Sequence, residues 1–286
     1  MSPHVKGVFL TIFAAIVWST GGLLVKLITL DAFTILFYRS LYAGLFFLLV
    51  FRKQAIHLDR RVLLIAVCYA PLLICFVTAT KLTTAANAIF LQYISPAIVL
   101  VLEPRILNQK IKAHNLLTVL VCTIGLSFFL LNQGKGHSWI GDGLALLSGF
   151  FSAFLILSLR FSNQTQQMSG IFFGNVLVVL ITLFWFLKSP APTLPEHGML
   201  IFLGVIQIGL GYLLFTYGQR CISAIESSLI AMLEPILNPI WVMIGYNEFP
   251  SGWSIAGGLT IIVALTIHII FFTAYSKSPP VKYKAG

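Results

Sequence analysis

Charged residues are scarce in this sequence of 286 residues: they make up 9% of it, whereas 58% of the residues are apolar. A soluble domain typically carries about 25% charged residues, so a water-soluble globular fold is excluded. Intrinsic disorder and a collagen-like repeat are excluded by the same composition. Each bilayer crossing takes about 20 apolar residues. Ten crossings therefore use about 200 residues and leave no room for a sizeable soluble domain, so the function must lie inside the membrane.

Cysteines and catalytic motifs are also few. The closest two of the four cysteines, Cys68 and Cys75, are seven residues apart on an expected helix, which is about 10 Å along its axis. A disulfide needs Cα atoms within about 7 Å, and the spacing of the cysteines does not fit a zinc site. The sequence contains no His-Glu-x-x-His, Gly-x-Ser-x-Gly or Walker motif. We therefore expect neither a metal nor another cofactor, and no enzyme or self-contained ATP-driven pump.

Ten apolar stretches, separated by charges, prolines and glycines, predict an all-α membrane protein with ten transmembrane helices. They cover approximately residues 7–28, 33–51, 62–80, 83–102, 115–131, 139–159, 169–187, 198–218, 222–244 and 253–273.

The net charge of +10 does not indicate a nucleic-acid partner, because the basic residues lie at the ends of the apolar stretches. With a cytoplasmic amino terminus, thirteen basic residues face the cytoplasm: Lys6, Arg52, Lys53, Arg60, Arg61, Arg105, Lys110, Lys112, Arg160, Arg220, Lys277, Lys282 and Lys284. Only four face the other side: Lys26, Lys81, Lys135 and Lys188. This positive-inside bias predicts that both termini are cytoplasmic. We expect an integral protein of a bacterial inner membrane.

An internal repeat divides the chain. A shift of 139 residues carries 62–131 onto 201–270 and aligns Pro96 with Pro235, and a shift of 136 aligns the first two stretches with the sixth and seventh. The predicted first half is residues 1–134, the second half is 135–275, and 276–286 form a disordered cytoplasmic tail. A unit of five spans is odd, so its second copy enters the membrane from the opposite side. Inverted repeats of this kind surround a central cavity in many secondary transporters, with substrate bound near the midplane.

Glu234 lies near the middle of the ninth stretch, about 15 Å from either surface. Ionisable groups at that depth are costly and mark functional sites. Ser227, Ala231 and Asn238 share its helical face. Glu234 is therefore a candidate for binding substrate and for coupling transport to protons. The alternative is that it only ties helices together through hydrogen bonds.

Arg39 in the second stretch is about 9 Å from the expected outer boundary. An arginine can extend much of that distance to the interface, so a structural role stays open. As a functional group it would hold a substrate carboxylate or neutralise a glutamate.

Further polar and aromatic residues within the apolar stretches complete the expected site. The predicted substrate-binding residues are Glu234, Trp18, Gln92, Tyr93, Gln207, Tyr212, Asn238 and Arg39. Glu226 and its repeat equivalent Asn87 are predicted gate residues. Pro96, Pro235 and Pro239 are predicted hinges, because proline removes a backbone donor and interrupts a helix.

Short motifs along the spans resemble the EamA-type members of the drug/metabolite transporter superfamily. They are Ala15-Ile16-Val17-Trp18, Phe37-Tyr38-Arg39, Leu233-Glu234-Pro235-Ile236 and Gly245-Tyr246-Asn247-Glu248, with a weaker copy at Leu107-Asn108-Gln109-Lys110. The resemblance extends over about residues 5–273. It implies ten helices in two inverted five-helix repeats around a central cavity. It also implies transport of amino acids, nucleobase-like compounds or amphipathic drugs. The chain departs from the family where Ser95 and Gln109 stand at positions that often hold glutamate, so the two halves do not share their charges.

The sequence therefore favours a secondary-active or facilitative transporter of small metabolites that works by alternating access. A channel or membrane scaffold is the alternative, and a membrane-embedded enzyme is favoured less. The expected partners are a small-molecule substrate, the lipid bilayer and protons.

Overall fold

The computed structural model describes residues 2–106, 110–131, 137–218, 221–222 and 230–273, and all regular structure within these ranges is helical. The helices in chain order are α1 (Pro3–Ser19), α2 (Gly21–Leu27), α3 (Ala32–Phe51), η1 (Arg52–Gln54), α4 (Arg60–Leu82), α5 (Ala85–Gln92), α6 (Ser95–Ile106), α7 (Ala113–Leu130), α8 (Trp139–Arg160), α9 (Gln164–Lys188), α10 (Leu194–Ile201), η2 (Phe202–Leu210), α11 (Gly211–Gly218), α13 (Leu233–Tyr246), α14 (Gly252–His268) and η3 (Ile269–Thr273).

Eight helical segments in the described ranges are long and apolar enough to cross a membrane, and Ala113–Phe129 is a shorter apolar helix. These nine elements fall on nine of the ten predicted stretches. The early part of the ninth stretch, residues 223–229, lies outside the described residues, as does the predicted tail, and α13 covers the later part of that stretch. Large apolar side chains such as Leu49 and Ile244 point outward, with exposed fractions of 75% and 72%. Such an apolar exterior suits a lipid environment, and the protein is an all-helical integral membrane protein.

The helix ends follow from local sequence signals. Asp31, Asp59 and Ser138 each accept backbone N–H bonds at the start of a helix, as N-cap residues do. Asn163 and Gln166 form a capping box, so α9 begins at Gln164, five residues before the predicted boundary. The sequence predicts a loop before residue 169 because the polar first turn of this helix lacks the apolar residues that mark a span.

Several spans are interrupted inside the membrane body. The first bends at Thr20 between α1 and α2, and the fourth is broken at Tyr93–Ile94 between α5 and α6. The eighth contains the π-helix η2 between α10 and α11. Irregular backbone at membrane depth is tolerated only where it is buried in protein or lines a cavity. These breaks therefore point to the interior of the bundle as the functional region.

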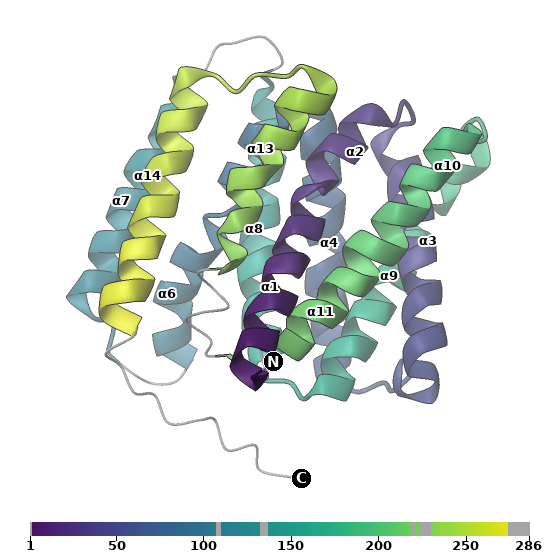
Figure 1. Cartoon of the computed structure of the whole chain (residues 1–286), viewed down its shortest axis with the longest axis horizontal. Helices are drawn as coiled ribbons and strands as arrows, with labels where there is room; N and C mark the ends of the chain where they lie inside the picture. The colour runs from purple at the N-terminus through teal and green to yellow at the C-terminus, as the bar shows by residue number, and fades with distance from the viewer. Residues whose placement is uncertain (1, 107–109, 132–136, 219–220, 223–229, 274–286) are drawn as a thin grey trace.

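The helix α4 lies at the centre of the packing. It packs against α8 and α9, while α3 packs against α9. The largest fully buried side chain is that of Tyr69 on α4. Gly174 of α9 gives it room, since a Cβ there would lie 2.5 Å from the Tyr69 ring. Figure 1 shows α7 and α14 together at one edge of the bundle and α3 beside α10 at the opposite edge.

The bundle has two ends, a near end and a far end. The near end is the end where α1 begins at Pro3 and α3 terminates at Phe51, at the bottom of Figure 1. The far end is the opposite one, where α2 and the start of α10 lie.

Candidate functional site

Tyr93 and Glu234 meet at two helix breaks. Tyr93 occupies the turn between α5 and α6, and its hydroxyl donates a hydrogen bond of 3.0 Å to Oε2 of Glu234. The same hydroxyl lies 3.1 Å from the carbonyl oxygen of Ala231. Pro96 sits in the first turn of α6, where proline is well tolerated because an N–H at that position has no helical partner. The predicted hinge therefore adjoins the break that orients Tyr93.

Glu234 lies in the first turn of α13, directly before Pro235. The positive end of the helix dipole favours a carboxylate at that point. Glu234 lies deep among the helices, and yet its side chain keeps partial accessibility. Glu234 is therefore not fully sealed among the helices. Pro239 lies inside the same helix and interrupts its hydrogen bonds one turn further on.

Arg39 is linked to two other predicted site residues. Its Nη2 donates to Oε1 of Gln207 at 2.7 Å, and Nε2 of Gln207 donates to the carbonyl oxygen of Trp18 at 3.0 Å. Gln207 belongs to the π-helix η2, a type of element that recurs at functional sites. The carbonyl of Trp18 lies beside the bend at Thr20.

The guanidinium of Arg39 is buried, with 4% of the residue exposed, and its Nε has no hydrogen-bond partner. Among the described residues, no carboxylate oxygen lies within 4 Å of a guanidinium nitrogen of Arg39, the limit for an ion pair. Glu234 attracts it from a greater distance. A buried cation without a paired anion is unfavourable. An anionic group placed beside Arg39 would therefore be stabilised by the guanidinium.

Aromatic rings form one wall of this site. The Trp18 ring lies 5.2 Å from that of Tyr212 and 5.0 Å from that of Phe215, and Tyr212 lies 6.2 Å from Tyr69. Gly211 permits this packing, since a Cβ there would lie 2.4 Å from Nε1 of Trp18. Aromatic side chains can cover an apolar part of a ligand while nearby polar groups orient it.

We call Trp18, Arg39, Tyr93, Gln207, Tyr212 and Glu234 the central cluster. Hydrogen bonds and a ring contact join Trp18, Arg39, Gln207 and Tyr212, and a separate hydrogen bond joins Tyr93 to Glu234. The two groups lie near enough for Glu234 and Arg39 to attract each other without forming an ion pair, and together they are six of the eight predicted binding residues. Asn238 is buried against Gly22, one turn after Glu234, and its Oδ1 has no partner. Gln92 is half-buried next to Tyr93, and within the described part of the chain no side-chain hydrogen bond links it to the cluster.

The predicted gate residues have different outcomes. Glu226 lies outside the described residues. Asn87 is fully buried on α5, and its Nδ2 donates to both carboxylate oxygens of Asp142 at 3.2 and 3.3 Å. Ser254 donates to Oδ1 of Asn87 at 2.6 Å, and Thr83 donates to Asp142 at 2.7 Å. Asn87 thus joins α5 to α8 and α14.

A second set of contacts lies beside this one at the far end. Nζ of Lys26 is 2.7 Å from Oε2 of Glu248 and donates to the carbonyl oxygen of Thr83 at 2.8 Å. The other oxygen of Glu248 accepts the backbone N–H of Ala85 at 2.7 Å. We call Lys26, Thr83, Asn87, Asp142 and Glu248 the far-end network. Apart from the Lys26–Thr83 hydrogen bond, which lies within residues 26–87, the contacts among these five residues join residues 26–87 to residues 142–248.

Sequence reasoning missed several of these residues. Tyr69 looked like one more aromatic residue in an apolar span, and Lys26 and Asp142 looked like ordinary boundary charges. The available signal was the presence of single charges at the ends of otherwise apolar stretches. Such charges need a partner when they are buried. The described residues contain no group of three or more His, Cys, Asp or Glu side chains that could hold a metal ion.

Comparison with known proteins identifies the family. The model of the EamA-like transporter family matches residues 5–131 and again 139–270. The chain belongs to this family. It is therefore an integral membrane transporter of small molecules and not an enzyme.

Among its relatives are EamA-type transporters with named substrates. The pseudopaline exporter CntI of Pseudomonas aeruginosa is 27% identical over 268 residues, which cover 91% of this chain and 94% of the exporter. The biotin transporter of Escherichia coli K12 is 22% identical over 200 residues, which cover 65% of each chain. A solved crystal structure aligns with a TM-score of 0.66 and 14% sequence identity, covering 94% of this chain and 98% of its own. That likeness supports the fold.

Proposed function

We propose that this EamA-family transporter carries small zwitterionic metabolites, with the carboxylate held by Arg39 and the cationic group held by Glu234. The observation that carries this proposal is the buried Arg39 guanidinium, whose Nε has no partner and whose nearest hydrogen-bond acceptor is the neutral Gln207. An arginine presents planar donors that match a carboxylate. Glu234 keeps Oε1 outside the Tyr93 hydrogen bond, so this oxygen is free for a substrate ammonium group.

The aromatic wall narrows the substrate class further. Trp18, Tyr212 and Phe215 pack around the same interior space as the charged pair. A compound with a flat or apolar side chain beside its zwitterionic head would bury that side chain against these rings. We therefore choose an aromatic amino acid, L-phenylalanine, as the test substrate.

The transport mode that we propose is alternating access between two inverted halves, residues 1–134 and 135–275. The family model matches the chain twice, once in each half. Figure 1 also supports inversion: α1 runs from the near end to the far end, whereas α8 runs the opposite way. The two helices that follow the breaks also run in opposite directions: α6 runs from mid-height to the near end, and α13 runs from mid-height to the far end. With the predicted ninth stretch, of which α13 forms the described part, each half would contain five spans.

The far-end network supports a conformation closed at that end. The Lys26–Glu248 ion pair and the hydrogen bonds of Asp142 with Thr83 and Asn87 cross from the first half to the second, and Asn87 and Asp142 are buried. Opening the far end requires these contacts to separate, so we propose Asn87 as a gate residue of this end. The charge bias of the loops supports a cytoplasmic near end and a location in a bacterial inner membrane.

The alternative role for Glu234 is neutralisation of Arg39 without substrate contact. A counterflow experiment in proteoliposomes separates the two roles. Purified full-length protein is tested with radiolabelled L-phenylalanine, with phenethylamine, which lacks the carboxylate, and with N-acetylphenylalanine, which lacks the ammonium group. We expect saturable counterflow of phenylalanine and at least about tenfold less of either analogue, since each loses one charged contact.

The variants Glu234→Gln and Arg39→Gln should each abolish this counterflow. Glu103→Gln is the matched control, because Glu103 pairs with Arg160 at 2.6 Å, away from the central cluster. Wild-type counterflow by either cluster variant would overturn the proposal. Non-saturable flux with single-channel currents would favour the channel instead. Uptake driven by a pH gradient in the wild type, and absent in Glu234→Gln, would support our proposal that Glu234 also carries the coupled proton.

A further inference from the structure

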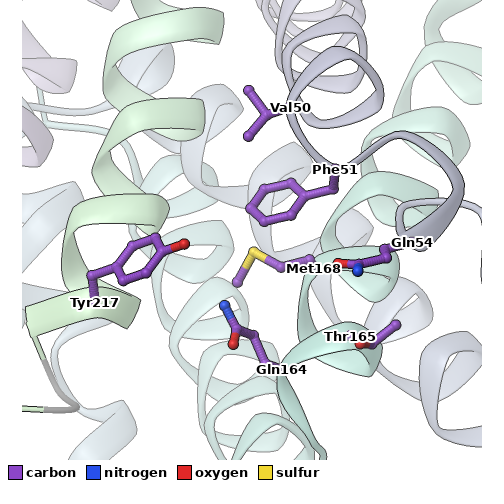
Figure 2. Close-up of a pocket in the computed structure, with 7 residues that line it drawn as sticks. All are labelled: Val50, Phe51, Gln54, Gln164, Thr165, Met168 and Tyr217. Atoms are coloured by element: carbon purple, nitrogen blue, oxygen red, sulfur yellow. The ribbon is translucent and has the colours of Figure 1, made fainter.

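A pocket of about 520 Å³ opens at the near end of the bundle, apart from the central cluster. Figure 2 shows its lining side chains directed toward a common space. They are Val50, Phe51, Gln54, Gln164, Thr165, Met168 and Tyr217. The volume lies within the range of about 300–1,000 Å³ that is usual for small-molecule sites.

The walls of this near-end pocket are held by specific contacts. Arg52 has a positive φ of 49°, at the point where α3 ends and the chain turns into η1. The carbonyl oxygen of Gln54 then accepts a hydrogen bond of 2.6 Å from the buried Ser169. On the other side, Nε2 of Gln166 donates to Asp59 at 2.6 Å and fixes the first turn of α9 against the start of α4. The pocket is therefore a built part of the fold.

Both predicted halves contribute to the pocket, and two of its helices lead to the central cluster. Tyr217 lies five residues after Tyr212 on α11, about 7.5 Å along the axis, and Val50 lies eleven residues after Arg39 on α3, about 16 Å along the axis. Alternating access separates and closes the halves, so a site between them at the near end changes with the transport cycle.

The lining determines the chemistry of the ligand. None of the seven side chains carries a charge, so a charged group would find no counter-ion among them. Gln54 and Gln164 each offer a carboxamide donor and acceptor, and Thr165 and Tyr217 carry hydroxyl groups. Phe51 and Met168 supply an aromatic ring and a polarisable thioether that pack well against a flat apolar group. The pocket fits a net-neutral compound with polar groups at one end and an aromatic ring at the other.

We propose that this pocket is a second binding site, at which the transported molecule binds before it reaches, or after it leaves, the central cluster. The proposal rests on the proposed function for the identity of the molecule, since L-phenylalanine combines a net-neutral polar head with a flat ring. It extends that function by assigning Gln54, Gln164 and Thr165 to a site at the near end.

Protection of an introduced cysteine tests the second site independently of the central one. The variant Thr165→Cys is made in a Cys221→Ser background, because the other three cysteines are buried. Its labelling by N-ethylmaleimide is measured in membrane vesicles with and without L-phenylalanine. At about four times the Kd, labelling should slow about fivefold, because only the unoccupied fraction reacts.

The deciding measurement repeats this experiment with Glu234→Gln also present. Protection that persists places L-phenylalanine at the near-end pocket even when the central cluster is disabled. Gln54→Ala together with Gln164→Ala should remove that protection. Lys53→Cys is the matched control, because Lys53 lies on η1 beside the pocket without lining it, and its labelling should not respond.

Two results would overturn the proposal. The first is labelling of Thr165→Cys that L-phenylalanine does not slow, and the second is protection that disappears with Glu234→Gln. Val50→Cys serves as a second reporter if the threonine variant does not fold. Loss of phenylalanine counterflow in Glu234→Gln with retained pocket protection would uphold both proposals, whereas retained counterflow with retained protection would reject the central site alone.

Discussion

The Tyr93 hydroxyl and the Glu234 carboxylate are joined by a 3.0 Å hydrogen bond between residues 141 positions apart in the chain. Each partner stands at a break within a span: Tyr93 follows α5, and Glu234 lies in the first turn of α13. The bond therefore links the two interrupted helices. A movement of either helix alters the surroundings of the carboxylate.

Removal of this hydroxyl should weaken substrate binding without removing the charge. We expect Tyr93→Phe to raise the KM for L-phenylalanine counterflow at least about tenfold, in line with a hydrogen bond to a charged group worth about 1.5–3 kcal/mol. Tyr246→Phe is the control, since Tyr246 is exposed near the far end of α13. A KM that does not change in Tyr93→Phe would show that the bond plays no part in binding.

The ion pair of Lys26 and Glu248 should stabilise the far-end network. Their side chains are only 10% and 18% exposed, so Lys26→Met leaves a largely buried carboxylate without its cation. We expect a loss of about 2 kcal/mol in the free energy of unfolding, below the full cost of an unpaired charge in a dry interior. The double variant with Glu248→Gln should recover part of this loss in an SDS titration. A double variant less stable than Lys26→Met would contradict this account.

Asp59 should make stability depend on pH at the start of α4. The backbone N–H of Val62 donates to it and is the main cause that holds its pKa below the usual value, with Gln166 and His57 adding to the effect. A lowered folded pKa stabilises the protein above the ordinary aspartate pKa of about 3.9, and this contribution is lost as the pH falls through the folded value. We expect Asp59→Ala to cost about 1 kcal/mol at pH 7. The difference in thermal midpoint between the wild type and Asp59→Ala should shrink as the pH falls from about 5 to about 3.

Two glycines of the eighth span should respond differently to alanine. A Cβ at Gly204 would lie 2.5 Å from the carbonyl oxygen of Arg39 and 2.6 Å from Cβ of Tyr42, whereas a Cβ at Gly198 meets no atom within 4 Å. We expect Gly204→Ala to cost about 1–3 kcal/mol through overpacking and to lower counterflow by displacing Arg39. Gly198→Ala should be neutral or slightly stabilising. Equal effects of the two substitutions on the thermal midpoint would argue against close packing at Gly204.

The sequence predicts the helices well because their signals are local. Apolar runs of sufficient length mark the spans, and residues such as Asp31 and Asp59 mark their starts through caps. Pro96 and Pro235 indicate breaks because proline acts on its own helix. The six residues of the central cluster could be proposed because polar or aromatic groups are conspicuous at mid-depth in apolar stretches.

The pairing of these residues could not be predicted in the same way. That Arg39 bonds to Gln207 depends on how α3 and η2 pack, and that Asn87 meets Asp142 depends on α5 and α8. These relationships join residues 168 and 55 positions apart, and hydrophobic periodicity carries no information about such distances. The near-end pocket is a further case, since it arises where η1, α9 and α11 converge.

The π-helix Phe202–Leu210 places Gln207 within reach of both Arg39 and the carbonyl oxygen of Trp18. A π-helix holds more residues per turn than an α-helix, so its reversion to α geometry rotates each side chain by up to about 100° for every residue of slippage. Rewinding this segment would carry the amide of Gln207 away from the guanidinium while the span stays continuous. The hydrogen bond between Gln207 and Arg39 therefore depends on the winding of this span. Its loss through rewinding would leave the guanidinium available for a new bond while the span stays helical.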